Sequence, residues 1–197
     1  MKYPDDVDFF YFLEQHGWST CLIYVEGQIF KMGPTHIFEN PIEVLLEAFT
    51  SILKGESKSE FVWHDEPGEY NWKIQVIPEQ KHKVKISITN CELLQSNTKP
   101  SLEILEFEVK LNLFCICIKK QMEKIQEMLT EASFKENREN GFPHKAFKEF
   151  IGSLPRKNSY KSLQHRSASL HWTVFKSRLY GFAAQKYSIK PQLKNCR

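Results

Sequence analysis

Apolar and polar positions alternate along the middle of the chain, between residues 61 and 88. The apolar positions are Phe61, Trp63, Tyr70, Trp72, Ile74, Val76, Val84, Ile86 and Ile88. A period of two residues indicates strands that bury one face and expose the other. Because residues 65–68 and 78–80 have turn sequences, we predict an antiparallel meander. A fourth strand is predicted over residues 105–111, where the alternation returns.

Helical periodicity appears in three later segments, which we predict as helices over residues 41–53, 112–132 and 142–151. The first of them has Asn40 as its N-cap and Pro41 at its first helical position. The last is expected to bury Phe147, Phe150 and Ile151.

The N-terminal residues suggest a short helix followed by a hairpin. Acidic residues in the first turn and apolar residues at helical spacing predict a helix over residues 5–15. Its predicted apolar face is Phe9, Phe12 and Leu13. Residues 19–24 and 28–31 are rich in β-branched and aromatic residues, with a tight turn at residues 26–27 between them.

These elements together predict an α+β fold. We expect one antiparallel meander sheet with helices packed on one face, while the opposite face stays polar and exposed. With 197 residues, of which 41% are hydrophobic and 13% aromatic, the chain can bury a sizeable core.

Charge divides the chain into two parts of different character. Residues 1–155 contain 17 basic and 24 acidic residues, a net charge of −7. Residues 156–197 contain 10 basic residues and no acidic residue, a net charge of +10. We therefore predict an acidic α+β domain over residues 1–155 and a basic tail over residues 156–197.

The tail could form one amphipathic helix over residues 168–183. Its apolar stripe would contain Trp172, Phe175, Leu179 and Phe182, with Lys176 and Arg178 beside it. Such a helix suits nucleic acid, an anionic membrane surface or an acidic partner. It could also fold back on the acidic domain, or be an extension without a selected function.

Cysteine usage and the N-terminus bear on the compartment. The five cysteines form no CxxC pair, and Cys21, Cys115 and Cys117 lie in apolar runs, so we expect buried free thiols. Acidic residues occupy the N-terminus where a signal peptide needs a basic start and an apolar core. These features favour a cytoplasmic protein.

Candidate chemistry gathers at one predicted turn, where His64, Asp65, Glu66 and Glu69 lie close together in sequence. These residues could hold a divalent metal or perform acid–base chemistry. We favour turn chemistry and solvated charge instead, because no second ligand cluster completes a site. We therefore predict no catalytic residue, no metal and no cofactor, and no small-molecule ligand is evident.

Acidic side chains of the predicted sheet offer a surface for a basic partner. The candidate binding residues are Glu60, Asp65, Glu66, Glu69, Glu106 and Glu108. Opposite potentials on two surfaces raise the rate at which they associate. Ordinary solubility charge is the competing interpretation.

The segment from Trp63 to Trp72, with the sequence WHDEPGEYNW, resembles a family of small bacterial proteins that carry a W-x-D-E-P-G-E-Y-x-W hairpin. Proteins of this size and organisation are similar to immunity proteins of bacterial toxin systems, including contact-dependent growth inhibition. The resemblance implies a non-catalytic protein that binds and blocks a cognate toxin domain.

Three hypotheses follow for the function. The first is an immunity protein that neutralises a basic, nuclease-like toxin through an acidic surface. The second is a binder of nucleic acid or a membrane surface that acts through the tail. The third is an enzyme that uses the turn at residues 64–69.

Overall fold

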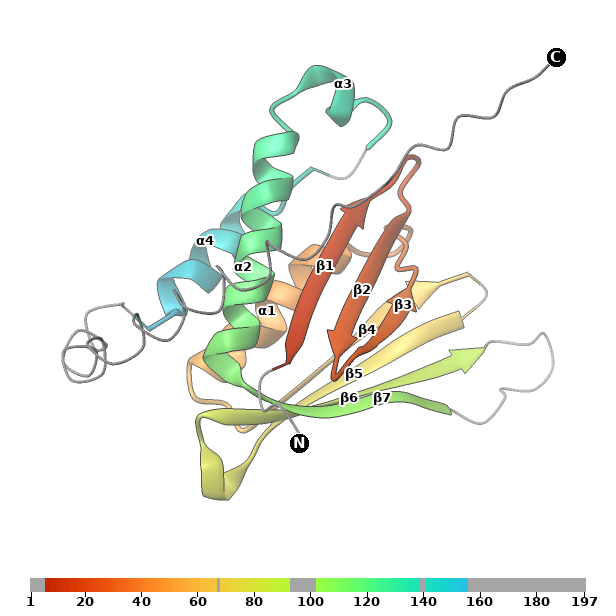
Figure 1. The fold of residues 1–197 in the computed structure, drawn as a ribbon. Coiled ribbons are helices and arrows are strands. Elements are labelled where there is room, and N and C mark those ends of the chain that lie inside the picture. The colour runs from red at the N-terminus through yellow and green to blue at the C-terminus, as the bar shows by residue number, and fades with distance from the viewer. Residues whose placement is uncertain (1–5, 67, 93–101, 139–140, 156–197) are drawn as a thin grey trace, which may run out of the picture. The chain divides into compact units, whose positions relative to one another are not determined.

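The computed structural model describes residues 6–66, 68–92, 102–138 and 141–155, and Figure 1 shows their arrangement. Seven strands and four α-helices form an α+β fold, as predicted. The strands are β1 (Val7–Leu13), β2 (Ser19–Val25), β3 (Gln28–Met32), β4 (Lys58–Asp65), β5 (Gly68–Val76), β6 (Lys83–Glu92) and β7 (Leu102–Lys110). The helices are α1 (Pro41–Leu53), α2 (Leu111–Met128), α3 (Ala132–Lys135) and α4 (His144–Ser153), with the 3₁₀ turn η1 (Pro78–Gln80).

The strands form two antiparallel sheets rather than the single sheet expected. One has the order β1-β2-β3, and the other is the predicted meander β4-β5-β6-β7. Helix α1 packs against β4 and α4, while α2 runs along β1 and also contacts β7. The inner faces of both sheets and the apolar faces of α1 and α2 therefore enclose one core.

The helix predicted over residues 5–15 is wrong, because this segment forms strand β1. Phe9, Tyr11 and Leu13 point into the core, whereas Phe12 lies on the other face and is 41% exposed. Aromatic residues favour strands, and residues 7–13 pair along their whole length with β2. The tertiary pairing overrides a helical spacing that three apolar residues satisfied by coincidence.

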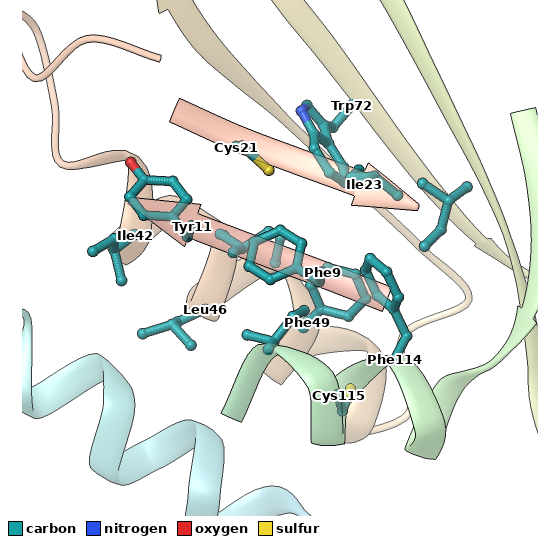
Figure 2. Close-up of a cluster of buried hydrophobic side chains, with 14 of the residues drawn as sticks. Phe9, Tyr11, Cys21, Ile23, Ile42, Leu46, Phe49, Trp72, Phe114 and Cys115 are labelled. Atoms are coloured by element: carbon teal, nitrogen blue, oxygen red, sulfur yellow. The ribbon is translucent and has the colours of Figure 1, made fainter. Parts of the chain in front are cut away.

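The core is aromatic, and Figure 2 shows part of it between β1, β2, α1 and α2. Phe114 of α2 is fully buried, and its ring centroid lies 5.9 Å from that of Phe9 and 5.5 Å from that of Phe49. Phe107 of β7 lies 5.8 Å from the same ring. One side chain of α2 thus joins β1, α1 and β7.

Helix α1 begins as predicted. The Asn40 Oδ1 atom accepts hydrogen bonds from the backbone N–H groups of Ile42 and Glu43, at 3.0 and 3.4 Å, and Pro41 follows at the first helical position. The Trp63 indole also donates a hydrogen bond of 2.9 Å to the Pro41 carbonyl oxygen. The start of α1 is therefore fixed both locally and by β4.

Helices α2 and α4 agree with the predicted periodicity in most positions. Helix α2 buries Phe114, Ile118, Met122 and Ile125. Helix α4 buries Phe147 and Phe150, but Ile151 is 37% exposed, so its predicted burial is wrong. Ile151 follows Phe147 by four residues and Phe150 by one, so it lies at the edge of the buried face of α4 and not at its centre.

Cys21, Cys115 and Cys117 form no disulfide within the described part of the chain, as expected, but only Cys21 and Cys115 are buried, whereas Cys117 is half-buried. No helix among the described residues is both long and apolar enough to span a membrane. The predicted basic tail lies outside the described residues.

A chain of buried hydrogen bonds ties β1 to β2 and to the segment after β3. The Ser19 hydroxyl donates to the Pro34 carbonyl oxygen at 2.7 Å, so the Tyr11 hydroxyl, 2.7 Å from Ser19 Oγ, donates its own proton to Ser19. Burial raises the pKa of Tyr11, which keeps this proton in place. The two hydroxyl groups and the carbonyl oxygen of this buried series therefore all have hydrogen-bond partners without water.

We expect Ser19→Ala to lower the free energy of unfolding by about 1–3 kcal/mol, because it leaves the buried Tyr11 hydroxyl without its acceptor. It also removes one of the two hydrogen bonds that the Pro34 carbonyl accepts, while the bond of 3.1 Å from the backbone N–H of residue 19 stays. Urea denaturation followed by circular dichroism measures the change. The matched control is Thr20→Ala, whose hydroxyl bonds Glu14 at the exposed surface. Equal stability of the two variants would contradict a structural role for the buried chain.

Candidate functional site

The hairpin of β4 and β5 contains the residues with candidate chemistry. The strands pair antiparallel, with Trp63 opposite Tyr70, His64 opposite Glu69 and Asp65 opposite Gly68. Only two residues, 66 and 67, therefore connect the strands. Because side chains of a strand alternate between faces, neighbouring residues of this segment point in opposite directions.

The two tryptophans of the hairpin belong to the core. Trp63 and Trp72 are each 1% exposed, and their ring centroids lie 4.8 Å apart with the rings inclined by 65°. Phe61 stacks on Trp72 at 5.1 Å. The aromatic residues at the ends of the WHDEPGEYNW segment thus hold the hairpin against the rest of the protein.

Asp65 also belongs to the inner face, because it follows Trp63 by two residues. Its Oδ2 atom accepts a hydrogen bond of 2.9 Å from the Tyr70 hydroxyl. Burial, followed by the contact with Asp65, raises the pKa of Tyr70 to about 12. This carboxylate therefore closes the hairpin and is turned away from the outer face.

His64 and Glu69 lie on the outer face. The His64 Nε2 atom is 3.9 Å from Glu39 Oε1, and its ring is 4.8 Å from the ring of Phe38, in an edge-on arrangement. Phe38 is 73% exposed. The Glu69 carboxylate accepts a hydrogen bond of 3.0 Å from the Asn71 side chain.

The imidazole of His64 and the carboxylate of Asp65 therefore do not converge. They extend from opposite faces of one strand, and Glu66 is exposed at the turn. Across the described residues, His, Cys, Asp and Glu side chains nowhere form a group of three or more that could hold a metal ion. The geometry does not assemble the acid–base or metal constellation that the sequence allowed.

The six carboxylates predicted to bind a partner divide into two groups. Asp65, Glu66 and Glu69 gather at the β4–β5 turn, although Asp65 faces inward. Glu60 lies further along β4, while Glu106 and Glu108 lie on β7. Because β4 and β7 are the two outermost strands of their sheet, these three do not form one cluster.

Lysines neutralise part of the second group. Lys58 Nζ lies 2.6 Å from Glu60 Oε1, and Lys85 Nζ lies 2.6 Å from Glu106 Oε1. The contact with Lys58 lowers the pKa of Glu60, and the contact with Lys85 lowers the pKa of Glu106. The far part of the outer face is therefore a mixed charge surface, not an acidic one.

The register reveals a separation of charge along the outer face of the four-stranded sheet. The two rows of described side chains nearest the turn contain no lysine or arginine; they are His64–Glu69–Cys91 and Val62–Asn71–Thr89. The rows farther from the turn contain Lys58, Lys73, Lys83, Lys85 and Lys110 among their residues. The turn end is therefore acidic, whereas the rest of this face has mixed charge, because Glu60, Glu106 and Glu108 lie among these lysines.

The structure adds Phe38 and Glu39 to this site, two residues that the sequence reading missed. They lie in the segment between β3 and α1, which reaches β4 through a hydrogen bond of 2.8 Å from the Thr35 N–H to the His64 carbonyl oxygen. The sequence shows a phenylalanine beside an acid in a connecting segment, but it contains no signal for their contact with His64. We call Phe38, Glu39, His64, Glu66 and Glu69 the acidic turn surface.

Trp172, Lys176 and Arg178, the residues predicted to form a surface on the tail, lie outside the described residues. Comparison of the chain with models of protein families, with curated proteins and with solved structures finds no significant match. The assignment of the acidic turn surface as a candidate site therefore depends on the structure alone.

We expect Tyr70→Phe to weaken the dependence of stability on alkaline pH. The native pKa is about 12 and the unfolded one about 10, so the hydroxyl contributes stability that is full below pH 10 and is lost as the pH rises towards 12. At pH 8 the variant should lose about 1 kcal/mol from the missing hydrogen bond to Asp65.

Urea denaturation at pH 8, 10 and 11 measures this difference. Tyr11 and Tyr24 remain in both proteins, so the difference between the two curves isolates Tyr70. The gap between wild type and variant should narrow above pH 10. A constant gap over this range would contradict a protonated Tyr70 that donates to Asp65.

Proposed function

We propose that this protein is a non-catalytic immunity-type protein that docks a basic toxin domain on its acidic turn surface. The observation that supports the proposal is the charge separation along the outer face of the four-stranded sheet. Glu39, Glu66 and Glu69 lie at the end whose two nearest rows contain no lysine or arginine.

Distance makes this end electrostatically distinct from the lysines. Lys73 follows Glu69 by four residues on β5, which separates them by about 13 Å at a rise of about 3.3 Å per residue. This exceeds the Debye length of about 8 Å at physiological ionic strength. The lysines of the described strands thus compensate the turn carboxylates only weakly, and a basic partner would meet a negatively charged surface.

Phe38 supplies the apolar contact that such an interface needs. Exposed aromatic residues often contribute a large share of binding energy at the centre of an interface. Because its ring rests against His64 at 4.8 Å, Phe38 has less conformational freedom to lose on binding. An anchored aromatic residue flanked by carboxylates suits a basic surface with an apolar recess.

A toxin domain is the partner that the WHDEPGEYNW resemblance suggests. Nuclease domains carry basic surfaces because their substrate is a polyanion, so an acidic inhibitor would attract them and occupy the same surface. Nothing in this mode of action requires a reaction at the His64–Glu69 turn.

The test compares two charge variants of the intact chain as baits in lysate of its native host. The turn variant is Glu39→Gln/Glu66→Gln/Glu69→Gln, and the control is Glu60→Gln/Glu106→Gln/Glu108→Gln. Both remove three carboxylates from the same domain. We expect wild type and control to capture a basic protein whose affinity falls about tenfold or more for the turn variant.

Co-expression then tests neutralisation. The captured protein should arrest growth alone and should not do so with the wild-type chain, while the turn variant should protect less. A captured protein that binds both variants equally, or that is harmless alone, would contradict the proposal.

A further inference from the structure

A hollow of about 370 Å³ lies on the outer face of the three-stranded sheet, away from the core. Its apolar wall contains Phe10, Leu22 and Ile29, which come from β1, β2 and β3. Phe10 pairs with Leu22 across the first two strands, and Ile29 pairs with Tyr24 across the second two. The register thus brings residues from all three strands to one place.

The same hollow has an acidic end. Asp6 and Asp8 line it, and the Tyr24 hydroxyl donates a hydrogen bond of 3.2 Å to Asp6 Oδ2. Asp8 lies directly opposite Tyr24 in the register. Among the described residues that line the hollow there is no lysine, arginine or histidine. The Asp8 carboxylate accepts a hydrogen bond of 2.8 Å from the Phe9 N–H group and also contacts the Cys117 thiol, and neither of these partners carries a positive charge.

Exposure of the wall residues indicates a surface that a ligand can reach. Ile29 is 68% exposed, and Phe10, Leu22 and Tyr24 are partly exposed. Large apolar residues at the surface of a small hollow, with a few convergent polar groups, are typical of ligand sites. The hollow is at the small end of the volumes that such sites have.

This sheet face already holds one cation. The Lys124 Nζ atom of α2 lies 5.4 Å from the centroid of the Phe12 ring, and Phe12 follows Phe10 on the same face of β1. An ammonium group is attracted by the negative face of an aromatic ring. The neighbouring Phe10 and Tyr24 offer rings to a second cation, with carboxylates that Phe12 lacks.

We propose that this hollow binds an organic ammonium ion carried on an apolar stem. The ammonium group lies between Asp6 and Asp8, and the stem packs on Phe10, Leu22 and Ile29. Both halves of the ligand are required, because the hollow joins an apolar wall to an acidic end. The site is on a different sheet from the acidic turn surface, so it does not depend on the function proposed above.

The probe is 2-phenylethylammonium, and its neutral counterpart is 2-phenylethanol, which has nearly the same shape. Titration of the ¹⁵N-labelled intact chain, followed by amide chemical shifts, measures both affinities. We expect a dissociation constant on the order of 1 mM for the ammonium ion, because the hollow is open to solvent. The alcohol should bind about tenfold more weakly, and the shifts should map to β1, β2 and β3.

Three variants separate the two halves of the site. Asp6→Asn/Asp8→Asn should lower the affinity for the ammonium ion about tenfold and leave the affinity for the alcohol unchanged. Ile29→Ser should lower the affinity for both ligands, and because Ile29 is 68% exposed the variant keeps the fold. The control, Glu26→Gln, removes a charge from the turn between β2 and β3, outside the hollow, and should change neither affinity.

Equal affinity for the ammonium ion and the alcohol would overturn the proposal, since the acidic end would then play no part. Absence of binding at 2-phenylethylammonium concentrations up to about 20 mM would overturn it as well. So would shifts that map to the four-stranded sheet, or equal losses in the double variant and the Glu26→Gln control.

Discussion

The Trp63 side chain is the point on which the arrangement of this protein depends. Its ring lies 5.9 Å from that of Tyr11 in the three-stranded sheet and 4.8 Å from that of Trp72 in its own sheet. Its indole N–H donates to the Pro41 carbonyl at the start of α1. One buried residue therefore fixes both sheets relative to α1, and it adjoins the hairpin that carries the acidic turn surface.

The two proposed binding surfaces follow from this arrangement because each is the outer face of a sheet whose inner face is buried. Packing determines the direction of the side chains, and the register determines which of them are neighbours. On the four-stranded sheet the result is a surface whose carboxylates lie among lysines everywhere except at the turn end. On the three-stranded sheet it is a hollow with both apolar and acidic walls.

Local signals in the sequence predicted much of the fold. The Asn40-Pro41 start of α1 and the alternation in β5 and β6 depend on near neighbours, and both are confirmed. Strand β1 was mispredicted because Phe9 and Leu13 suit either a strand or a helix, and only pairing with β2 decides between them. That pairing is a tertiary contact which periodicity does not contain.

The candidate site was predictable only in part. The alternation itself places Asp65 on the face of Trp63, so its inward direction could have been inferred from the sequence. The part that Glu39 and Phe38 play in the site could not be inferred from the sequence, because they reach His64 through a contact between segments far apart in the chain. Lys58 and Lys85 are evident in the sequence, but their pairing with Glu60 and Glu106 depends on the strand register and the side-chain rotamers, which the sequence does not give.

The charged residues of β7 have a consequence for self-association. An outermost strand offers backbone groups to which the same strand of another molecule can add, and this is a route to aggregation. Glu106, Glu108 and Lys110 alternate along the exposed side of β7. If two such strands paired in parallel and in register, like charges would lie side by side, so these residues disfavour growth of the sheet by that route.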